Sequence, residues 1–301
     1  MDGIGVIPIF VAVIENKGFS AAAEHLGITK SAVSKRITQL EQQLGAKLLH
    51  RTTRKISLTE AGEHYYVHAV KALAAAQDAQ DVVLQLQGEP QGKLRIHAPM
   101  SFGHLHVAPL IPDFLQRFPK ISVDLVLDDK TVDLVAEGFD VAILAGDLSD
   151  SNLIARKLAP GHSVVCASPD YIVQHGHPDT PQALTQHNCL QYSYSNNASQ
   201  WRFNRKAESY TVEVSGNYQA NNSEAILEAV LKGFGIARLP TFIAGPHINS
   251  GKLVNLFENY QMPHKDIHAV FIERQYMPEK VRVFLDFAIQ SFGGDIPYWD
   301  V

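Results

Sequence analysis

The sequence predicts an α/β chain in three parts: a small helical module, one long helix, and a larger α/β region. Three observations predict this organisation. Helical hydrophobic spacing fills the first 45 residues, no proline interrupts residues 59–87, and β-rich runs alternate with helical patterns from residue 92 onward. At 301 residues and 46% hydrophobic content, the chain is long enough for several buried cores.

Three short amphipathic helices are expected in the first 45 residues. In the first, Pro8 is acceptable because it lies in the first turn, and the inward residues are Ile7, Phe10, Val11 and Ile14. The second is expected to start with Ser20 as its N-cap, to turn Ala22, Ala23 and Leu26 inward, and to end at Gly27. Thr29 then caps KSAVSKRITQLEQQL, which Gly45 ends, and its inward residues are Val33, Ile37, Leu40 and Leu44.

The charge of this N-terminal part differs from that of the rest. Residues 1–60 hold eight Lys or Arg against five Asp or Glu, a balance of +3, whereas the whole chain carries −5, which leaves −8 for residues 61–301. Residues 30–55 hold seven bases and one acid. Such a patch is typical of a surface that binds a polyanion, and a solvated charged face is the alternative.

The outward face of the third helix is polar, short or cationic. It consists of Ser31, Ser34, Lys35 and Thr38, with Lys30 at the tip and Arg36 beside it. A helix with such a face fits the major groove, where lysine and hydroxyl groups reach base edges and phosphates. The following KLLHRTTRKISLT alternates apolar and polar residues around Thr52 and Thr53, which predicts a two-stranded wing with Arg51, Arg54 and Lys55 at or beside its tip.

FSAAAEHLGITKSAVSKRITQLEQQLGAKLLHRTTRKISLTEAG resembles the winged helix-turn-helix of LysR-type transcriptional regulators. The alternative, a purely structural three-helix bundle, leaves this run unexplained. The resemblance implies that the partner is double-stranded promoter or operator DNA. Together with the polar helix face and the wing, it gives the predicted DNA-contacting residues: Lys30, Ser31, Ser34, Lys35, Arg36, Thr38, Arg51, Thr53 and Arg54.

One long helix is expected between Thr59 and Gln87. Its heptad-spaced seam consists of Tyr65, Ala69, Ala72, Ala76, Ala79, Val83 and Leu86. Small alanines allow close approach of a second helix, which predicts a homodimer, and the alternative is a helix packed on its own chain. The family resemblance likewise implies dimerisation through this helix, pairing of dimers as tetramers, and contact with RNA polymerase.

GEPQG at residues 88–92 marks a domain boundary. Beyond it, KLRIHA, ISVDLVL, FDVAIL and SVVCAS alternate with helical runs, as in a parallel α/β sheet that binds ligands where its strands end. The stretches DVAILAGDLSDSNLIARKLAP, ASPDYI and GFGIARLPTFIA resemble the LysR effector-binding domain. The resemblance implies a periplasmic-binding-protein-like fold of two subdomains joined by crossing strands. The expected boundaries are 1–58 (winged helix-turn-helix), 59–88 (linker helix) and 92–301, divided into subdomain I (92–161 and 267–301) and subdomain II (162–266).

Polar turns at the strand ends give a candidate site for a small effector. Ser101 and nearby helix amides are placed to hold a carboxylate, and Asn222 faces them from the other subdomain, although each such residue is equally well a helix cap or a packed loop. Many LysR relatives have Arg where Leu144 stands, which favours a less charged or aromatic effector. The predicted contacts are Met100, Ser101, Phe102, Leu144, Gly146, His162, Asn221, Asn222 and Pro240.

Other functions find less support. Cys166 and Cys189 lack CxxC spacing and are expected to be buried thiols, with a redox switch as the alternative. The fourteen histidines include i, i+2 pairs but no zinc-site pattern, so no metal, cofactor or catalytic residue is predicted. The N-terminus lacks an export signal, and no membrane-spanning run occurs, so a cytoplasmic location is expected. A solute-binding protein is the rival interpretation, but it leaves the basic N-terminal residues unexplained.

Overall fold

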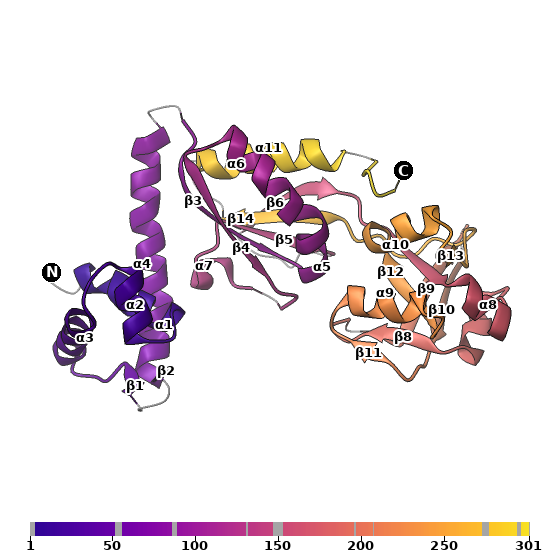
Figure 1. The fold of residues 1–301 in the computed structure, drawn as a ribbon, viewed down its shortest axis with the longest axis horizontal. Coiled ribbons are helices and arrows are strands. Elements are labelled where there is room, and N and C mark those ends of the chain that lie inside the picture. Colours follow the sequence, from indigo (N-terminus) through magenta and orange to yellow (C-terminus); the bar gives the residue numbers. More distant parts are fainter. Residues whose placement is uncertain are drawn as a thin grey trace. The chain divides into compact units, whose positions relative to one another are not determined.

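The first sixty residues form three helices and a two-stranded wing in a computed structural model of the chain (Figure 1). The structure describes residues 4–51, 56–85, 89–130, 132–146, 153–195, 197–206, 208–272, 277–293 and 296–300. A 3-10 turn at Ile4–Val6 leads into the first helix. The elements that follow are α1 (Ile7–Glu15), α2 (Phe19–His25), α3 (Lys30–Leu44), β1 (Leu49–Arg51) and β2 (Ile56–Leu58).

The predicted helix ends are correct at α3 and wrong at the start of α2. The Thr29 hydroxyl accepts a hydrogen bond from the Ala32 N–H at 3.2 Å, and Gly45 ends α3 in the left-handed region at φ 66°. Gly18, not Ser20, is the N-cap of α2. The earlier start places Phe19 in the helix, where it packs against the core of the module.

The core of this module holds the residues that helical spacing predicted, with one exception. Phe10, Val33 and Ile37 are completely buried. Leu44, expected inside, is 47% exposed, whereas Glu41 is buried at 3%. The last turn of α3 therefore points a carboxylate, and not a leucine, toward the wing.

The long helix is present as α4 (Glu60–Gln85). Its first half packs on its own chain: Tyr65 meets Phe10 edge to face at 5.2 Å between ring centroids, and Ala69 is buried. Further along the predicted seam, Ala76 is exposed. Leu86 lies outside the described residues, and the side chain of Val83 is not described. The expected seam thus divides into a part that belongs to the N-terminal core and a part that leaves a small-residue surface open.

The chain forms two compact units: an N-terminal unit of residues 1–89 with 133–139, and a C-terminal unit of residues 90–132 with 140–301. The C-terminal unit contains two five-stranded sheets. The first, in subdomain I, has the order β4-β3-β5-β14-β6. Its strands are β3 (Gly92–Ala98), β4 (Ile121–Leu127), β5 (Val141–Ala145), β6 (Leu153–Ala159) and β14 (Ile267–Ile272).

The helical segments of subdomain I follow β3 or end the chain. They are α5 (Met100–Phe102), a π turn at Gly103–Val107, a 3-10 turn at Ala108–Leu110, α6 (Ile111–Arg117) and α11 (Glu279–Phe292), while α7 (Leu134–Glu137) groups with the N-terminal unit. A single cluster of apolar side chains from β3, β5, β14 and α11 forms the core, including Leu94, Ile143, Ala269 and Phe284.

The second sheet, in subdomain II, has the order β11-β8-β12-β7-β13 and is accompanied by a hairpin. Its strands are β7 (Ser163–Ala167), β8 (Cys189–Tyr192), β11 (Gln219–Ala220), β12 (Ile236–Pro240) and β13 (Val254–Asn255), with the hairpin β9 (Gln200–Arg205) and β10 (Glu208–Glu213). The helices are α8 (Pro169–His175), a 3-10 helix at Pro181–Gln186, α9 (Ser223–Leu231) and α10 (Thr241–Asn249).

Both sheets are mixed, and not purely parallel as the alternating pattern suggested. The chain passes from β6 of the first sheet into β7 of the second, and later returns as β14. These crossing strands lie antiparallel to their neighbours: β14 pairs antiparallel with β5 and β6, and β7 pairs antiparallel with β12. Two subdomains joined by crossing strands require such reversals.

Candidate nucleic-acid interface and effector site

The outward face of α3 is the candidate nucleic-acid interface. With Val33 and Ile37 buried beneath it, Lys30, Lys35 and Arg36 project into solvent. Ser31 is also exposed, and Ser34 and Thr38 are half-buried. Within the described parts of the chain, no salt bridge involves any of these three cations. They are therefore available to phosphates.

The wing is present as a short two-stranded hairpin. β1 and β2 pair antiparallel, with Leu49 opposite Leu58 and Arg51 opposite Ile56. Arg51 ends β1, and its side chain is not described; the predicted contacts Thr53 and Arg54 lie outside the described residues.

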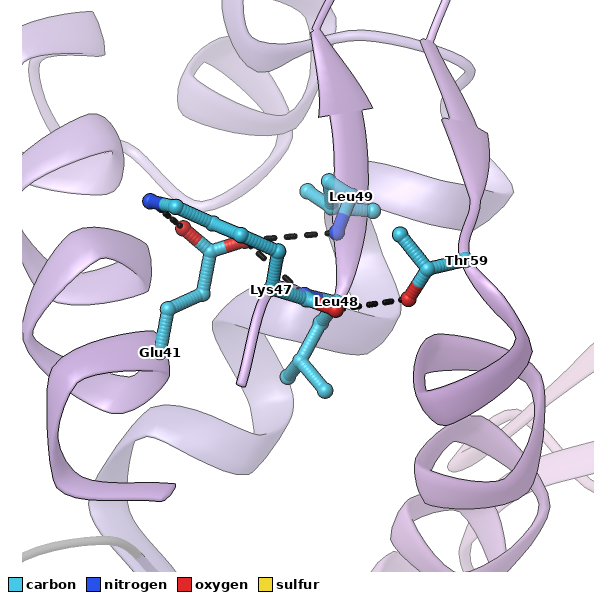
Figure 2. A network of polar contacts seen from close by, with 5 residues as sticks. All are labelled: Glu41, Lys47, Leu48, Leu49 and Thr59. Atoms are coloured by element: carbon cyan, nitrogen blue, oxygen red, sulfur yellow. Dashed lines mark hydrogen bonds and ion pairs between the residues drawn. The ribbon is translucent and has the colours of Figure 1, made fainter. Parts of the chain in front are cut away.

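A buried carboxylate joins the recognition helix to the wing (Figure 2). Oε1 of Glu41 accepts hydrogen bonds from the backbone N–H groups of Leu48 at 3.0 Å and Leu49 at 3.3 Å. Oε2 pairs with the Lys47 ammonium at 3.0 Å, and the lysine side chain is itself largely exposed. Hydrogen bonds to a charged, buried acceptor are stronger than neutral ones, so this contact fixes the wing's first strand against α3.

The same strand is also held to the start of α4. The Thr59 hydroxyl donates to the Lys47 carbonyl at 2.6 Å, and the Thr59 N–H donates to the Leu48 carbonyl at 3.0 Å (Figure 2). A Cβ on Gly62 would lie 2.0 Å from that Leu48 oxygen, so the close approach requires glycine. Sequence reasoning overlooked Glu41, although its being the one acid within basic residues 30–55 was a usable signal.

In subdomain I, the predicted effector contacts after β3 differ in their solvent exposure. Met100 is 40% exposed, whereas Ser101 and Phe102 are buried at 6% and 2%. The Met100 N–H, which was expected to be open to a ligand carboxylate, already donates to Oδ1 of Asp129 at 2.9 Å. Asp129 lies two residues after the end of β4, and the carboxyl end of a parallel strand is where such a residue could have been sought.

Subdomain II presents its own polar turn toward this point. The Asn222 side-chain oxygen caps α9 by accepting from the Ala225 N–H at 2.9 Å, and exposed Asn221 donates to the Tyr194 hydroxyl at 3.4 Å. Nδ1 of His104, two residues after Phe102, lies 3.2 Å from Oε1 of Glu224. This contact brings the two predicted turns together.

Tyr192 of subdomain II lies beside Asp129 of subdomain I. Burial raises the pKa of the tyrosine, and the neighbouring carboxylate adds to that rise. The tyrosine ends β8, and sequence reasoning missed it. Asp129 thus lies between the start of α5 and the end of β8, at the place where the effector was expected.

The remaining predicted contacts lie along the crossing strands. Half-buried Leu144 pairs with His268 across β5 and β14, and Pro240 ends β12 opposite Ser163. Gly146 has φ 116°, and its N–H donates to the Asp266 carbonyl at 3.1 Å.

His162 is engaged by the C-terminal segment of the chain, since its Nδ1 lies 2.9 Å from Oδ2 of Asp300. The predicted ring of effector contacts is therefore only partly assembled: His104 and Glu224 draw the α5 and α9 turns together, whereas His162 is bound elsewhere.

A separate pocket of about 610 Å³ opens at the other edge of the second sheet, where β8, β11 and β12 begin. It is lined by Tyr171, His187, Asn188 and Phe234 among others, and by none of the predicted effector contacts. Its polar groups are already bonded: Asn188 donates to the Phe234 carbonyl at 2.8 Å, and the Tyr171 hydroxyl lies 3.2 Å from Nδ1 of His187.

The two cysteines are buried on either side of β12. Register places Cys166 of β7 opposite Ala237 and Cys189 of β8 opposite Ile236, so a strand separates them. Burial raises the pKa of each thiol to about 12. Among the described residues, no group of His, Cys, Asp or Glu is arranged to hold a metal ion, and no helix is long and apolar enough to cross a bilayer.

A helix-turn-helix with a cationic, exposed helix face, a wing, and a C-terminal pair of α/β subdomains define a DNA-binding regulator with a sensor domain. Family comparison agrees along nearly the whole chain. Residues 6–63 match the bacterial regulatory helix-turn-helix protein, lysR family, and residues 87–293 match the LysR substrate binding domain. The chain belongs to the LysR family of transcriptional regulators.

Curated relatives are similar along their full length. The chain is 35% identical over 288 residues to the probable HTH-type transcriptional regulator LtrA of Klebsiella pneumoniae, covering 95% of this chain and 93% of that one. It is 37% identical over 286 residues to PtxR of Pseudomonas aeruginosa, covering 94% and 91%. These relatives are transcriptional regulators and not enzymes, and so is this chain.

Solved structures share the architecture. CrgA, a LysR-type transcriptional regulator from Neisseria meningitidis, is 34% identical with a TM-score of 0.63, covering 96% of this chain and 99% of that one. The full-length Vibrio cholerae virulence activator AphB, a member of the LTTR protein family, is 28% identical with a TM-score of 0.63, covering 95% and 98%.

Proposed function

We propose that α3 enters the major groove of a promoter and reads it through Lys30, Ser31, Ser34, Lys35, Arg36 and Thr38, while Arg51, Thr53 and Arg54 of the wing approach the adjacent groove. The observation that carries this proposal is the exposure of Lys30, Lys35 and Arg36 without ion pairs among the described residues. Arginine and lysine so placed gain a phosphate partner without giving up an internal one.

The protein acts as a homodimer, and dimers pair as tetramers, so that two winged helices occupy successive half-sites. The exposed Ala76 of α4 supports this because it offers a close-packing surface beyond the N-terminal core. A regulator bound to promoter DNA is located in the cytoplasm and within reach of RNA polymerase. The functional division follows residues 1–58, 59–88 and 92–301, with subdomain II at 162–266.

A small effector binds between the two subdomains of the 92–301 region, and its contacts come from Met100, Ser101, Phe102, Leu144, Gly146, His162, Asn221, Asn222 and Pro240. The support is the pairing of His104 with Glu224 and the proximity of Tyr192 to Asp129, which place the α5 and α9 turns close together. Because effector binding changes the angle between subdomains, it changes the arrangement of dimers on DNA.

Anisotropy of a labelled DNA fragment from upstream of the gene tests the proposal, with random DNA as competitor and a salt series. Binding that survives competitor and weakens with salt is expected. A protein that binds neither this fragment nor random DNA at low salt contradicts the DNA-binding role of α3.

The effector site is tested separately by thermal unfolding with a panel of small neutral, aromatic and anionic compounds. A compound that raises Tm in the wild type and not in Asn221→Ala, with Lys252→Ala as an exposed control, supports the site. A hit that stabilises all three proteins equally places the ligand elsewhere.

A further inference from the structure

The last described segment of the chain, residues 296–300, lies against both subdomains. Trp299 is only 2% exposed, although it is two residues from the C-terminus. Its indole packs against Phe102 and Phe292 of subdomain I, each at 5.8 Å between ring centroids, and against Phe242 of α10 at 6.4 Å. Figure 1 shows the C-terminus beside α10. One aromatic ring thus fills space that belongs to both halves of the C-terminal unit.

The backbone of the segment touches α10 as well. A Cβ on Gly245 would lie 2.4 Å from the Trp299 carbonyl oxygen, closer than real Cβ contacts allow. Gly245 lies in the middle of α10, where glycine lowers helix stability. The close approach of the C-terminal segment explains why glycine occupies this position.

His106 links the segment to both subdomains. This side chain is 5% exposed, and burial lowers its pKa. Its Nδ1 hydrogen-bonds to the Tyr298 hydroxyl, and its Nε2 lies 3.0 Å from the Phe242 carbonyl oxygen. The imidazole therefore joins the turn after α5, the C-terminal segment and α10 in one chain of contacts.

The final contact reaches the crossing strand. Asp300, whose side chain is 14% exposed, pairs with His162 at 2.9 Å, and the His162 carbonyl accepts from the Thr241 N–H at 3.0 Å. His162 lies between β6 and β7, where the chain passes from one sheet to the other. A movement of one subdomain relative to the other must therefore disturb the contact between His162 and Asp300.

We infer that residues 296–300 form a strap that sets the angle between the two subdomains and must yield when that angle changes. This inference rests on the proposed function only in its consequence, because the effector signal would then pass through the strap. Docking has a compensating cost: Nε1 of Trp299 is buried without a hydrogen-bond partner within the described structure. This unpaired donor lowers the stability of the docked strap.

The direct test measures the distance between the subdomains in the full chain. Spin labels at Gln116→Cys on α6 and Val173→Cys on α8 report it, since both sites are exposed while native Cys166 and Cys189 are buried. Excess unlabelled protein limits each oligomer to one labelled chain. Gly245→Ala, which displaces the strap and keeps every aromatic ring, and Asp300→Asn are the test variants; Ile296→Ala, at a position 68% exposed, is the control.

We expect the distance distribution to broaden or shift in Gly245→Ala and Asp300→Asn and to stay unchanged in Ile296→Ala. Hydrogen exchange should accelerate about tenfold in residues 100–107, 160–162 and 241–249, with both sheets unaffected. Unchanged distances, or faster exchange spread evenly over both sheets, would overturn the strap. Neither DNA nor effector is present in this experiment, so failure of the proposed function would leave its result intact.

Discussion

The Glu41 carboxylate of α3 accepts the backbone N–H of Leu48 at 3.0 Å, which ties the recognition helix to the wing. The residue lies one turn before the end of α3, and its burial at 3% leaves no water to replace these bonds. The angle between α3 and the wing therefore depends on this side chain.

Glu41→Gln should lower the free energy of unfolding by about 1–3 kcal/mol, because the acceptor of the Leu48 and Leu49 N–H groups becomes a neutral amide oxygen and an NH2 donor replaces the oxygen that pairs with Lys47. Urea denaturation measures this free energy of unfolding. DNA affinity should fall as well, since the wing is no longer held. Gln42→Ala, exposed on the same turn, is the control. Equal stability of Glu41→Gln and wild type would contradict the network.

Lys35→Ala should weaken DNA binding and reduce the slope of log affinity against log salt by about 0.9, the contribution of one phosphate contact. Titration by anisotropy between low and moderate salt gives the slope. Lys252→Ala removes the same charge from an exposed site in subdomain II and should leave affinity and slope as in wild type. A wild-type slope in Lys35→Ala shows that this lysine does not meet phosphate.

Ala76→Glu should break the proposed dimer, because a charged side chain at the proposed alanine contact would lose its hydration without gaining a partner. Light scattering after size-exclusion chromatography measures the mass. Lys71→Glu introduces the same residue on the same helix but off the seam, and it should keep the wild-type mass. Identical masses for both variants would place the dimer contact elsewhere.

The free energy of unfolding should decrease as the pH is lowered below about 6.5, the ordinary pKa of histidine. The reason is that burial lowers the pKa of His106 in the folded protein. The unfolded chain then binds a proton that the folded chain does not. The stabilisation is present above the unfolded pKa and is lost as pH falls toward the folded one.

Each such proton changes the free energy of unfolding by at most about 1.4 kcal/mol per pH unit. His106→Gln should flatten the profile between about pH 7 and pH 5, although the lowered pKa values of His187 and His247 leave a residual slope. His177→Gln is the exposed control. A profile in His106→Gln as steep as in wild type would show that His106 does not take part.

Thiol reagents should react slowly with the native protein, since burial raises the pKa of both cysteines to about 12 and keeps them as thiols. Absorbance after addition of a chromogenic disulfide measures the rate, and the protein in urea should release two equivalents at once. Rapid native reaction, or loss of DNA binding on mild oxidation, would revive the redox alternative.

Local rules determined the N-terminal part of this protein. Helical spacing, Thr29 as a cap and Gly45 as a stop gave the correct recognition helix, because these signals act within one or two turns. The same rules failed at Leu44 and Glu41, where the wing, a separate element, decides which side chain is buried. No local pattern shows that a carboxylate will find two backbone N–H groups seven and eight residues away.

Alternation of strands and helices indicated an α/β region and the family resemblance implied its two subdomains, and this architecture is confirmed. What only the tertiary structure decided is which distant residues meet. Asp129 occupies the amide that Ser101 and its helix were expected to offer a ligand, and Trp299 covers Phe102 from nearly 200 residues away in the sequence. Such pairings depend on how crossing strands return and how the two sheets pack. Local sequence patterns do not distinguish the residues of these long-range contacts from those of an ordinary loop.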